Sequence, residues 1–181
     1  MGMPRLSQHC IQVFLNRANL ANSMTDKGRA LEDLICYVLE EIPGVTVTTR
    51  NKQNVFRTEE IDVAIWNERA SNGLAFLPSV ILIECKNWSQ PVTSEELSWF
   101  HTKICNRGLS FGILIAANGI TGDAQNLTQA QEILSKALAQ QRQIVVITMS
   151  EILTFRNTNQ VVNLVKKKLC DLVVYGGLPL Q

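Results

Sequence analysis

A short apolar segment, Val80–Ile83, leads directly into an acidic and a basic residue at Glu84 and Lys86. The segment is aliphatic and follows a polar turn, as expected of a strand in the interior of a sheet. Side chains alternate between the two faces of a strand, so Glu84 and Lys86 would leave its end on the same face. Burying ionisable groups is costly unless they are paired or bind an ion. The segment therefore predicts either an ion pair or an ion-binding site.

Chain length favours one domain. The chain has 181 residues, of which 46% are hydrophobic and 18% charged, enough for one well-packed core and too few for two of ordinary size. We expect a single domain over residues 1–181, with an accessory helix in 1–25, a core in 26–155 and a closing helix in 156–181. There is no secretory signal and no apolar run long enough to cross a bilayer, so we expect a cytoplasmic protein without membrane contact.

The cysteines predict free thiols. They are odd in number, widely spaced and form no C-x-x-C pair, which argues against a disulfide framework and against a zinc site. The five positions are Cys10, Cys36, Cys85, Cys105 and Cys170.

Hydrophobic periodicity alternates between helical and strand segments. Helices are expected over about residues 5–22, 28–42, 93–106, 123–141, 149–155 and 161–174. Strands are expected over residues 45–49, 61–66, 80–86, 109–117 and 144–148. The second and third strands are most simply antiparallel neighbours, whereas the fourth follows a helical crossover and should lie parallel to the third. The pattern predicts an α/β fold.

The same periodicity places Asp62 and Glu84 at the ends of neighbouring strands. Two carboxylates and a backbone carbonyl, here that of Cys85, are the hard oxygen ligands that Mg²⁺ prefers. Lys86 would lie beside such an ion, and the set could orient a water and stabilise charge on a phosphate. The E-x-K triplet by itself is a weak signal. A cross-strand ion pair at a solvated sheet edge explains these residues equally simply.

The order of elements and motifs resembles the PD-(D/E)-x-K nuclease superfamily, and looks most like Mrr-type restriction endonucleases and archaeal Holliday junction resolvases. The resemblance covers roughly residues 26–155. Its motifs are the helix opening Gly28–Glu32, the acid in Ile61–Asp62, the strand Ile83–Trp88, and the later segments Pro91–Val92, Asn106–Gly108, Gly112–Ile115 and Gly119–Thr121. It implies a restriction-endonuclease-like three-layer α/β/α core, with a central mixed sheet of four to five strands and an extra N-terminal helix.

The resemblance also implies an activity and a set of site residues. The activity is hydrolysis of DNA phosphodiesters with Mg²⁺, for which Mn²⁺ should substitute, leaving 5′-phosphate and 3′-hydroxyl ends. Asp62, Glu84 and the Cys85 backbone carbonyl would bind the metal, and Lys86 would position or activate the attacking water. Glu32 matches the helix acid that orients a metal-bound water or lies just outside the ligands in several members.

The sequence departs from the family pattern just before the first acid. Ile61 replaces the motif's proline, and Glu59 and Glu60 stand where glycine-containing turns often occur. The two extra acids either support the metal ligands from outside or repel the phosphate. Glu60 shares a strand face with Asp62 and is an alternative ligand. Glu32 also has a simpler interpretation as an exposed helix acid.

Candidate substrate contacts come from two places. Residues 48–57 carry three cations and no acid, and the turn after residue 86 carries polar side chains. The candidates are Arg50, Lys52, Arg57, Asn87 and Gln90. A second cationic cluster lies at Lys166–Lys168. With a net charge of only +1, either cluster is also explained as a solvated surface, and polar residues are ordinary turn formers.

We therefore expect a metal-dependent DNA endonuclease that acts in restriction or defence against foreign DNA. The alternatives are a structure-selective junction or repair nuclease, and a nuclease-fold DNA-binding or assembly module that does not cut. A hydrolase of small phosphorylated molecules lacks support, because no glycine-rich phosphate loop is present. No separate DNA-reading module is visible, so a separate specificity subunit is a possible partner. Cutting both strands favours a homodimer.

Overall fold

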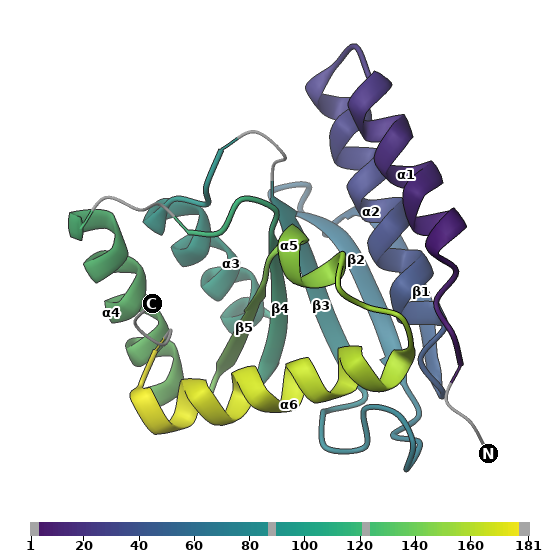
Figure 1. Ribbon diagram of the computed structural model, residues 1–181. Coiled ribbons are helices and arrows are strands. Elements are labelled where there is room, and N and C mark those ends of the chain that lie inside the picture. Colours follow the sequence, from purple (N-terminus) through teal and green to yellow (C-terminus); the bar gives the residue numbers. More distant parts are fainter. Residues whose placement is uncertain (1–3, 87–89, 121–123, 178–181) are drawn as a thin grey trace.

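The computed structural model describes residues 4–86, 90–120 and 124–177, with the backbone alone described over 124–127, and it centres on a five-stranded mixed sheet (Figure 1). The strands are β1 (Val45–Gln53), β2 (Glu60–Asn67), β3 (Val80–Lys86), β4 (Phe111–Ala116) and β5 (Gln143–Ile147). They lie in the order β1-β2-β3-β4-β5. The pairs β1–β2 and β2–β3 are antiparallel, and the pairs β3–β4 and β4–β5 are parallel. This confirms the predicted antiparallel pairing of the second and third strands and the predicted parallel pairing of the third and fourth.

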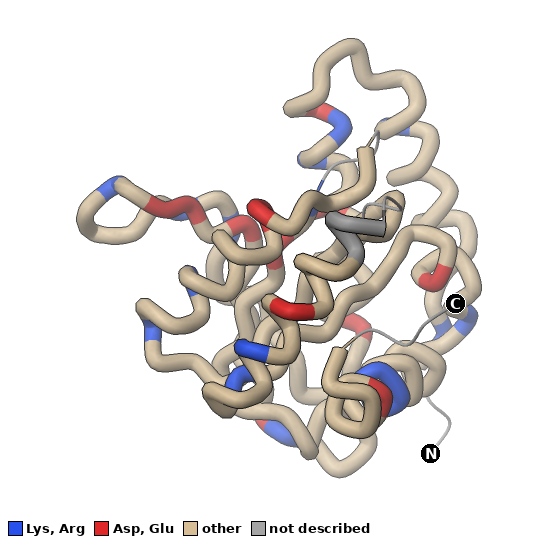
Figure 2. Tube along the Cα trace, turned by 90° about the vertical axis from the view of Figure 1, so that its left-hand side faces the viewer, with Lys and Arg blue, Asp and Glu red and all other residues tan. Residues whose placement is uncertain are grey.

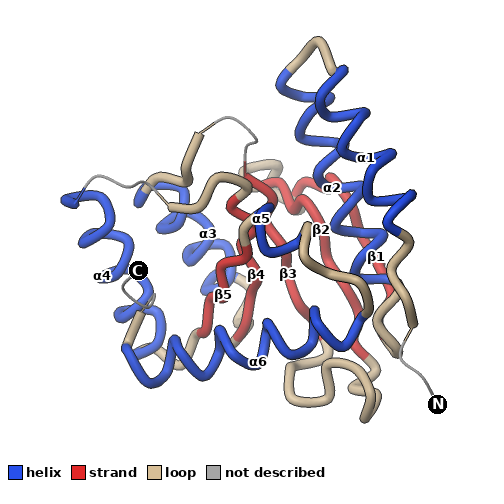
Figure 3. Tube along the Cα trace, in the orientation of Figure 1, coloured by secondary structure: helices blue, strands red, loops and turns tan. Residues whose placement is uncertain are grey.

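Helices cover both faces of the sheet (Figures 1 and 3). The described helices are α1 (Gln8–Leu20), α2 (Met24–Glu40), α3 (Ser94–Asn106), α4 (Ala124–Ala139), α5 (Met149–Ile152) and α6 (Thr158–Tyr175). One apolar layer joins α1, α2, α5 and α6 to the sheet, and a second joins α3 and α4 to its other face. This is the expected α/β/α core with an added N-terminal helix.

Side-chain caps determine where the helices beside the sheet begin. Ser23 accepts a hydrogen bond from the Asp26 backbone N–H at the start of α2. Thr93 and Glu96 form a reciprocal capping box at the start of α3. Lys103 is buried on α3 together with Leu97, Phe100 and Ile104.

A glycine in β4 lets α3 lie close to the sheet. A Cβ atom at Gly112 would lie 2.5 Å from Cδ1 of Ile104 and 2.8 Å from Cζ of Phe100. Gly112 is paired with Leu82 of β3, so this close approach occurs beside the strand that carries Glu84. A larger residue at position 112 would require the ends of the Ile104 and Phe100 side chains to shift.

The first strand is longer than its apolar pattern predicted. The β-branched residues end at Thr49, but β1 continues to Gln53 and stays paired with β2, with Arg50 opposite Val63 and Lys52 opposite Ile61. An edge strand needs no apolar alternation where its faces are solvated. The extension makes β1 and β2 a hairpin that projects from the body of the protein, at the left of Figure 2.

All five cysteine thiols are free, as expected. Burial raises the pKa of the Cys36 thiol to about 11, so that thiol stays protonated and unreactive at neutral pH. None of the helices in the described part of the chain is long and apolar enough to cross a membrane.

Candidate active site

Asp62 and Glu84 lie opposite one another where β2 begins and β3 ends. The antiparallel register pairs Val63 with Ile83, and the next positions along that register are Asp62 and Glu84. Directly opposite residues share one face of a sheet, with Cβ atoms about 5 Å apart. Glu84 is only 2% exposed. Two acids this close in a buried setting repel one another and require a cation.

The electrostatics of Asp62 reflect this requirement. Its Oδ2 atom accepts a hydrogen bond of 2.8 Å from the Cys85 backbone N–H. Burial, and next the negative charge of Glu84, raise the pKa of Asp62 to about 6, although the Cys85 N–H and the ammonium groups of Lys103 and Lys86 oppose the rise. A divalent cation beside Asp62 would favour its ionised form and remove this cost.

Two ammonium groups contact the Glu84 carboxylate. Lys86 Nζ lies 3.0 Å from Oε1. Lys103 Nζ, from α3, lies 2.8 Å from Oε1 and 2.7 Å from Oε2. Glu84 is therefore paired with lysines, but neither pair is the cross-strand pair considered as an alternative, because Lys86 lies on the same strand and Lys103 lies on α3. The Glu84 side chain is also only 3% exposed and is not at a solvated edge.

The charge state of Lys86 limits its role. Burial lowers the pKa of Lys86, but the charge and hydrogen bond of Glu84, and then the charge of Asp62, outweigh burial and raise it above the usual value. Lys86 is therefore protonated at neutral pH. In this arrangement it can donate a hydrogen bond and stabilise negative charge, but it cannot accept a proton as a general base.

Lys103 is a site residue that the sequence interpretation missed. It is 4% exposed and belongs to the inner face of α3 together with Leu97, Phe100 and Ile104. A signal was available, because Lys103 follows Phe100 by three positions and therefore falls on the apolar stripe of the predicted helix. A buried lysine needs a carboxylate partner.

The Cys85 backbone carbonyl points toward β2. The carbonyl of Lys86 accepts a hydrogen bond from Ala117, on the β4 side. Backbone groups of successive strand residues point to opposite edges, so the N–H and C=O of Cys85 face β2, as the bond from its N–H to Asp62 also shows. The paired stretch of β2 and β3 ends at Val63 and Ile83. The Cys85 carbonyl therefore faces the same side as Asp62.

These donors suit a magnesium ion. The carboxylates of Asp62 and Glu84 and the Cys85 carbonyl supply hard oxygen atoms, and Mg²⁺ is commonly held by one or two carboxylates with waters completing the octahedron. Within residues 4–86, 90–120 and 124–177, no three His, Cys, Asp or Glu side chains form a metal-binding group. The raised pKa of Asp62 is the observation that favours a cation in this position.

Glu32 lies on α2 and is tied to β1. Its Oε2 atom accepts a hydrogen bond of 2.7 Å from Asn51 and lies 3.9 Å from the Arg50 guanidinium. Burial raises the pKa of Glu32, although Asn51 and Arg50 oppose the rise. After burial and the charge of Asp62, the Glu32 charge is the next factor that raises the pKa of the Cys85 thiol. Glu32 therefore influences the end of β3 electrostatically, while its hydrogen bond and its ion pair are with Asn51 and Arg50 of β1.

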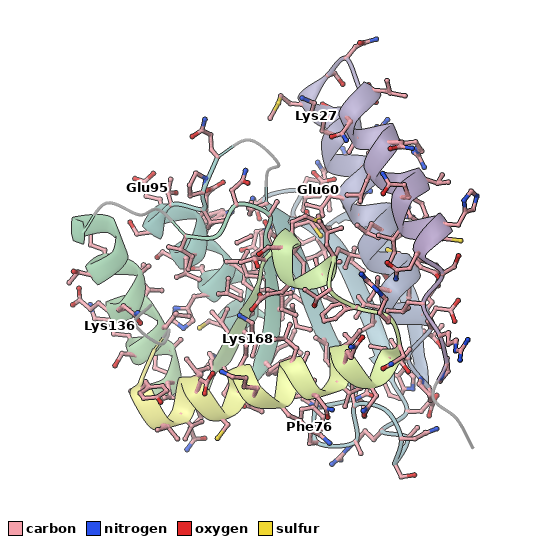
Figure 4. The ribbon with its side chains drawn as sticks, in the orientation of Figure 1. Lys27, Glu60, Phe76, Glu95, Lys136 and Lys168 are labelled. Carbon is pink, nitrogen blue, oxygen red and sulfur yellow. The ribbon has the colours of Figure 1, made fainter. Side chains whose placement is uncertain are left out.

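The two acids before Asp62 have different surroundings. Glu59 is buried, accepts a hydrogen bond of 2.8 Å from Asn106 and pairs with Arg107 at the end of α3. The hydrogen bond from Arg107 is the main reason that the pKa of Glu59 is lowered. Glu60 is exposed at the upper edge of the sheet (Figure 4). Glu59 is thus engaged by α3 and does not join the Asp62–Glu84 pair.

The candidate substrate contacts are distributed over the hairpin and the turn after β3. Arg50 pairs with Asp33 of α2 at 2.5 Å, so its guanidinium is already engaged. Lys52, Arg57 and Gln90 are exposed. Asn87 lies outside the described residues.

The cationic cluster Lys166–Lys168 is engaged in contacts within the protein. Its three partners lie on α6, on α5 and in the loop before β3, and Figure 4 labels Lys168 and Phe76. Lys168 pairs with Glu151 at 2.8 Å, Lys167 pairs with Asp171, and Lys166 lies 5.3 Å from the centre of the Phe76 ring. This cluster therefore has a structural explanation.

Comparison with known families agrees with the geometry. A family model described as restriction endonuclease, for the Mrr-type catalytic domain, matches residues 23–154. The match begins just before α2, ends after α5, and includes Asp62, Glu84, Lys86 and Lys103. No curated protein matches the chain at a significant level. Because the family model covers well over half of the chain, the protein belongs to the Mrr-type restriction endonuclease family.

Proposed function

We propose that this protein is a Mg²⁺-dependent DNA endonuclease and that Asp62, Glu84 and Lys86 form its reacting centre. One observation carries the proposal: the buried Glu84 and the half-buried Asp62 lie opposite one another on neighbouring strands, with the Lys86 ammonium 3.0 Å from Glu84 and the Cys85 carbonyl directed to the same side. Membership of a restriction endonuclease family supports nuclease action on DNA.

In the proposed mechanism, Asp62, Glu84 and the Cys85 carbonyl would hold the metal ion. When bound, Mg²⁺ or Mn²⁺ would supply Lewis acidity toward the scissile phosphate and would make a nearby water more acidic. Lys86 donates a hydrogen bond to the attacking water or to a phosphate oxygen and stabilises the negative charge that develops. Water attacks phosphorus in line and loses its proton to solvent, the P–O3′ bond breaks, and the leaving 3′-oxygen takes a proton from solvent, so the products carry 5′-phosphate and 3′-hydroxyl ends.

Lys103 and Glu32 are proposed as positioning residues. Lys103 contacts both oxygens of Glu84 from a buried position, so it limits rotation of the carboxylate. Glu32 is partly buried and held by Asn51, which suits an acid that orients a water at the edge of the site. We expect Glu32→Gln to lower the cleavage rate while changing the metal dissociation constant less than threefold. A tenfold loss of metal affinity would make Glu32 a ligand.

Membership of a restriction endonuclease family and the exposed cations of the hairpin support a proposal for the biological role. We propose restriction or defence against foreign DNA, with Lys52 and Arg57 as the cations available for phosphate contacts. A homodimer would place two reacting centres on the two strands, and a separate subunit would supply sequence specificity. Sedimentation velocity, with and without DNA, tests the dimer. A monomer under both conditions would remove that part of the proposal.

The central experiment is a cleavage assay on four DNA forms. Supercoiled, linear duplex, single-stranded and four-way-junction DNA are incubated with the protein in Mg²⁺, Mn²⁺ or EDTA. Asp62→Asn is the test variant, because asparagine can still accept the Cys85 hydrogen bond, and Glu40→Gln, at an exposed acid that ends α2, is the control.

We expect wild type and Glu40→Gln to cut duplex DNA with metal and not in EDTA, and Asp62→Asn to be inactive. Cleavage confined to junctions would assign a structure-selective nuclease. Binding of DNA without cleavage of any form would assign a non-cutting module. Equal cleavage by Asp62→Asn would overturn the proposed site.

A further inference from the structure

The β1–β2 hairpin presents two large apolar side chains to solvent. Val55 is 91% exposed and Phe56 is 80% exposed, at the tip of the arm that projects at the left of Figure 2. Val55 is the most exposed of the large apolar side chains in the described part of the chain. Apolar side chains in this position have no role in the protein core, which favours a role in binding.

The tip has a defined conformation. The Asn54 side chain donates to the Thr58 hydroxyl at 3.0 Å and accepts from the Thr58 backbone N–H at 2.9 Å. The Asn54 backbone donates to Glu59 at 2.8 Å and accepts from Arg57 at 2.9 Å. Arg57 has the left-handed φ of 55° that this turn requires. Val55 and Phe56 are therefore held outward by a hydrogen-bonded turn.

The hairpin is anchored to helices on both sides of the sheet. On one side Arg50 of β1 pairs with Asp33 of α2. On the other side Glu59, just before β2, pairs with Arg107 and accepts a hydrogen bond from Asn106 of α3. These contacts hold the arm in a fixed direction relative to the reacting centre, which suits a surface that positions a rigid ligand.

The charge of the arm suits a polyanion. No acid occurs between Glu41 and Glu59, and the exposed cations Lys52 and Arg57 flank the apolar tip. Glu59 is paired with Arg107, so Glu60, opposite Gln53 where the turn joins β2, is the remaining exposed acid of the arm. A surface with apolar side chains between cations matches duplex DNA, whose bases and sugars lie between rows of phosphates.

The arm and the reacting centre share a strand. Phe56 precedes Asp62 by six residues, and a strand rises about 3.4 Å per residue, so the two are separated by at most about 20 Å. Consecutive phosphates on one DNA strand are about 3.4 Å apart along the helix axis, so this reach corresponds to roughly six base pairs. One duplex can therefore contact the tip and the reacting centre together.

We propose that the β1–β2 hairpin is a DNA-binding arm. Lys52 and Arg57 neutralise phosphates, while Val55 and Phe56 pack against sugars and bases within roughly six base pairs of the scissile phosphate. The inference rests on the proposed function, because it takes DNA as the ligand. It adds an apolar contact from Val55 and Phe56, whereas the sequence interpretation of residues 48–57 considered only their cations.

Equilibrium binding to a short fluorescent duplex tests the arm without cleavage. Anisotropy is measured in EDTA over a range of salt concentrations. The two test variants are the pair Val55→Ser and Phe56→Ser, and the pair Lys52→Gln and Arg57→Gln. Their matched controls are Val174→Ser, at an exposed valine on α6, and Lys136→Gln, at an exposed lysine on α4 (Figure 4). Melting temperatures confirm that each variant is folded.

The two test variants should differ in salt dependence. Loss of the apolar tip should weaken binding on the order of 5- to 150-fold, the range measured for aromatic–base contacts, with an unchanged slope of log K against log salt. Loss of the two cations should weaken binding and reduce the magnitude of the slope by about 1.8, since each phosphate contact contributes about 0.9. Both control variants should bind within twofold of wild type.

Two results would overturn the inference. The first is wild-type affinity in the Val55→Ser and Phe56→Ser variant. The second is a shift from dimer to monomer in that variant during sedimentation, which would assign the tip to self-association. Asp62→Asn separates the arm from the chemistry, because it should keep wild-type binding and salt slope while losing cleavage. If wild type binds through the arm but cuts no DNA, the cleavage proposal fails and the arm stands.

Discussion

The Nζ atom of Lys103 lies 2.8 and 2.7 Å from the two carboxylate oxygens of Glu84, in a layer that is otherwise apolar. Lys103 lies in the last turn of α3, between Phe100 and Ile104, and is 4% exposed. It supplies a positive charge that cannot leave the site without movement of α3 or of its own side chain. The acids of the reacting centre are thus partly balanced by the protein itself.

Replacing Lys103 with methionine should destabilise the metal-free protein by about 3–5 kcal/mol. Removing the buried partner of an ion pair leaves the other charge poorly compensated, and the cation that stays on Glu84 is Lys86, at 3.0 Å and more exposed to solvent. Mg²⁺ should recover part of this loss by supplying a cation, and the variant should bind Mg²⁺ more tightly than wild type does. Urea unfolding in EDTA and in Mg²⁺, with calorimetric titration, measures both quantities.

The matched control is Lys136→Met, which removes an exposed ion pair with Glu132 on α4. Exposed pairs contribute at most about 1 kcal/mol, so this variant should stay close to wild type with or without metal. An equal loss of unfolding free energy in Lys103→Met and Lys136→Met would mean that the buried Lys103–Glu84 pair stabilises the protein no more than the exposed pair does.

Replacing Asp62 with asparagine should stabilise the metal-free protein above pH 6. The pKa of Asp62 rises to about 6 in the folded protein, mainly through burial, from 3.8 in the unfolded chain. The folded state therefore binds the proton more tightly, and ionised Asp62 costs stability that is fully expressed above about pH 6 and absent below about pH 4. The gain in Asp62→Asn should be about 2–3 kcal/mol at pH 8.

Urea unfolding in EDTA between pH 4 and pH 8 tests whether Asp62→Asn raises the free energy of unfolding. The difference between Asp62→Asn and wild type should shrink as the pH falls from 6 to 4. Glu95→Gln, at an exposed acid in the first turn of α3, should show no such trend. Destabilisation of Asp62→Asn at pH 8 would contradict this, because it would mean that the protein stabilises ionised Asp62 without a metal ion.

Metal binding should release protons in the same pH range. Asp62 must be ionised to act as a ligand, so the apparent affinity for Mg²⁺ should fall about tenfold per pH unit below pH 6 and level off above pH 7. Titration calorimetry at pH 6 in buffers of different ionisation enthalpy should detect about 0.5 proton released per ion. Affinity that is constant from pH 5 to pH 7 would exclude Asp62 as a titrating ligand.

Replacing Glu59 with glutamine should affect stability and leave metal binding unchanged. Glu59 pairs with Arg107 and accepts from Asn106, so loss of its charge should cost about 1–3 kcal/mol of unfolding free energy. The pKa of Glu59 is lowered, mainly by Arg107, so this contribution is present above the pKa of the unfolded chain and is lost as the pH falls through the lower folded value. A tenfold loss of Mg²⁺ affinity would return Glu59 to the list of ligands.

Much of the fold could be predicted from local sequence patterns. The run Ile81–Ile83 is apolar because this part of β3 is covered on both faces, and Thr93 and Glu96 mark the start of α3. The antiparallel pairing of β2 and β3 followed from their short connection. Those features depend on nearest neighbours along the chain, so the sequence displays them directly.

Contacts between distant segments were harder to predict. The pairing of Glu59 with Arg107 joins residues 48 positions apart, and the contact of Lys103 with Glu84 depends on how closely α3 packs on Gly112. A lysine on the apolar face of a predicted helix indicates that it has an acidic partner, but the sequence does not identify that acid. The sequence also could not show which lysines pair with Glu84, because those contacts depend on the three-dimensional structure.

The most direct test of the reacting centre is the single-turnover rate of plasmid nicking by Lys86→Gln at saturating Mg²⁺. Lys136→Gln serves as the matched control. Removing one donor that stabilises developing charge typically costs on the order of 100- to 1,000-fold in rate, and we expect a loss of that size for Lys86→Gln alone. A Lys86→Gln rate within threefold of an active wild type would contradict a reacting centre built on Asp62, Glu84 and Lys86.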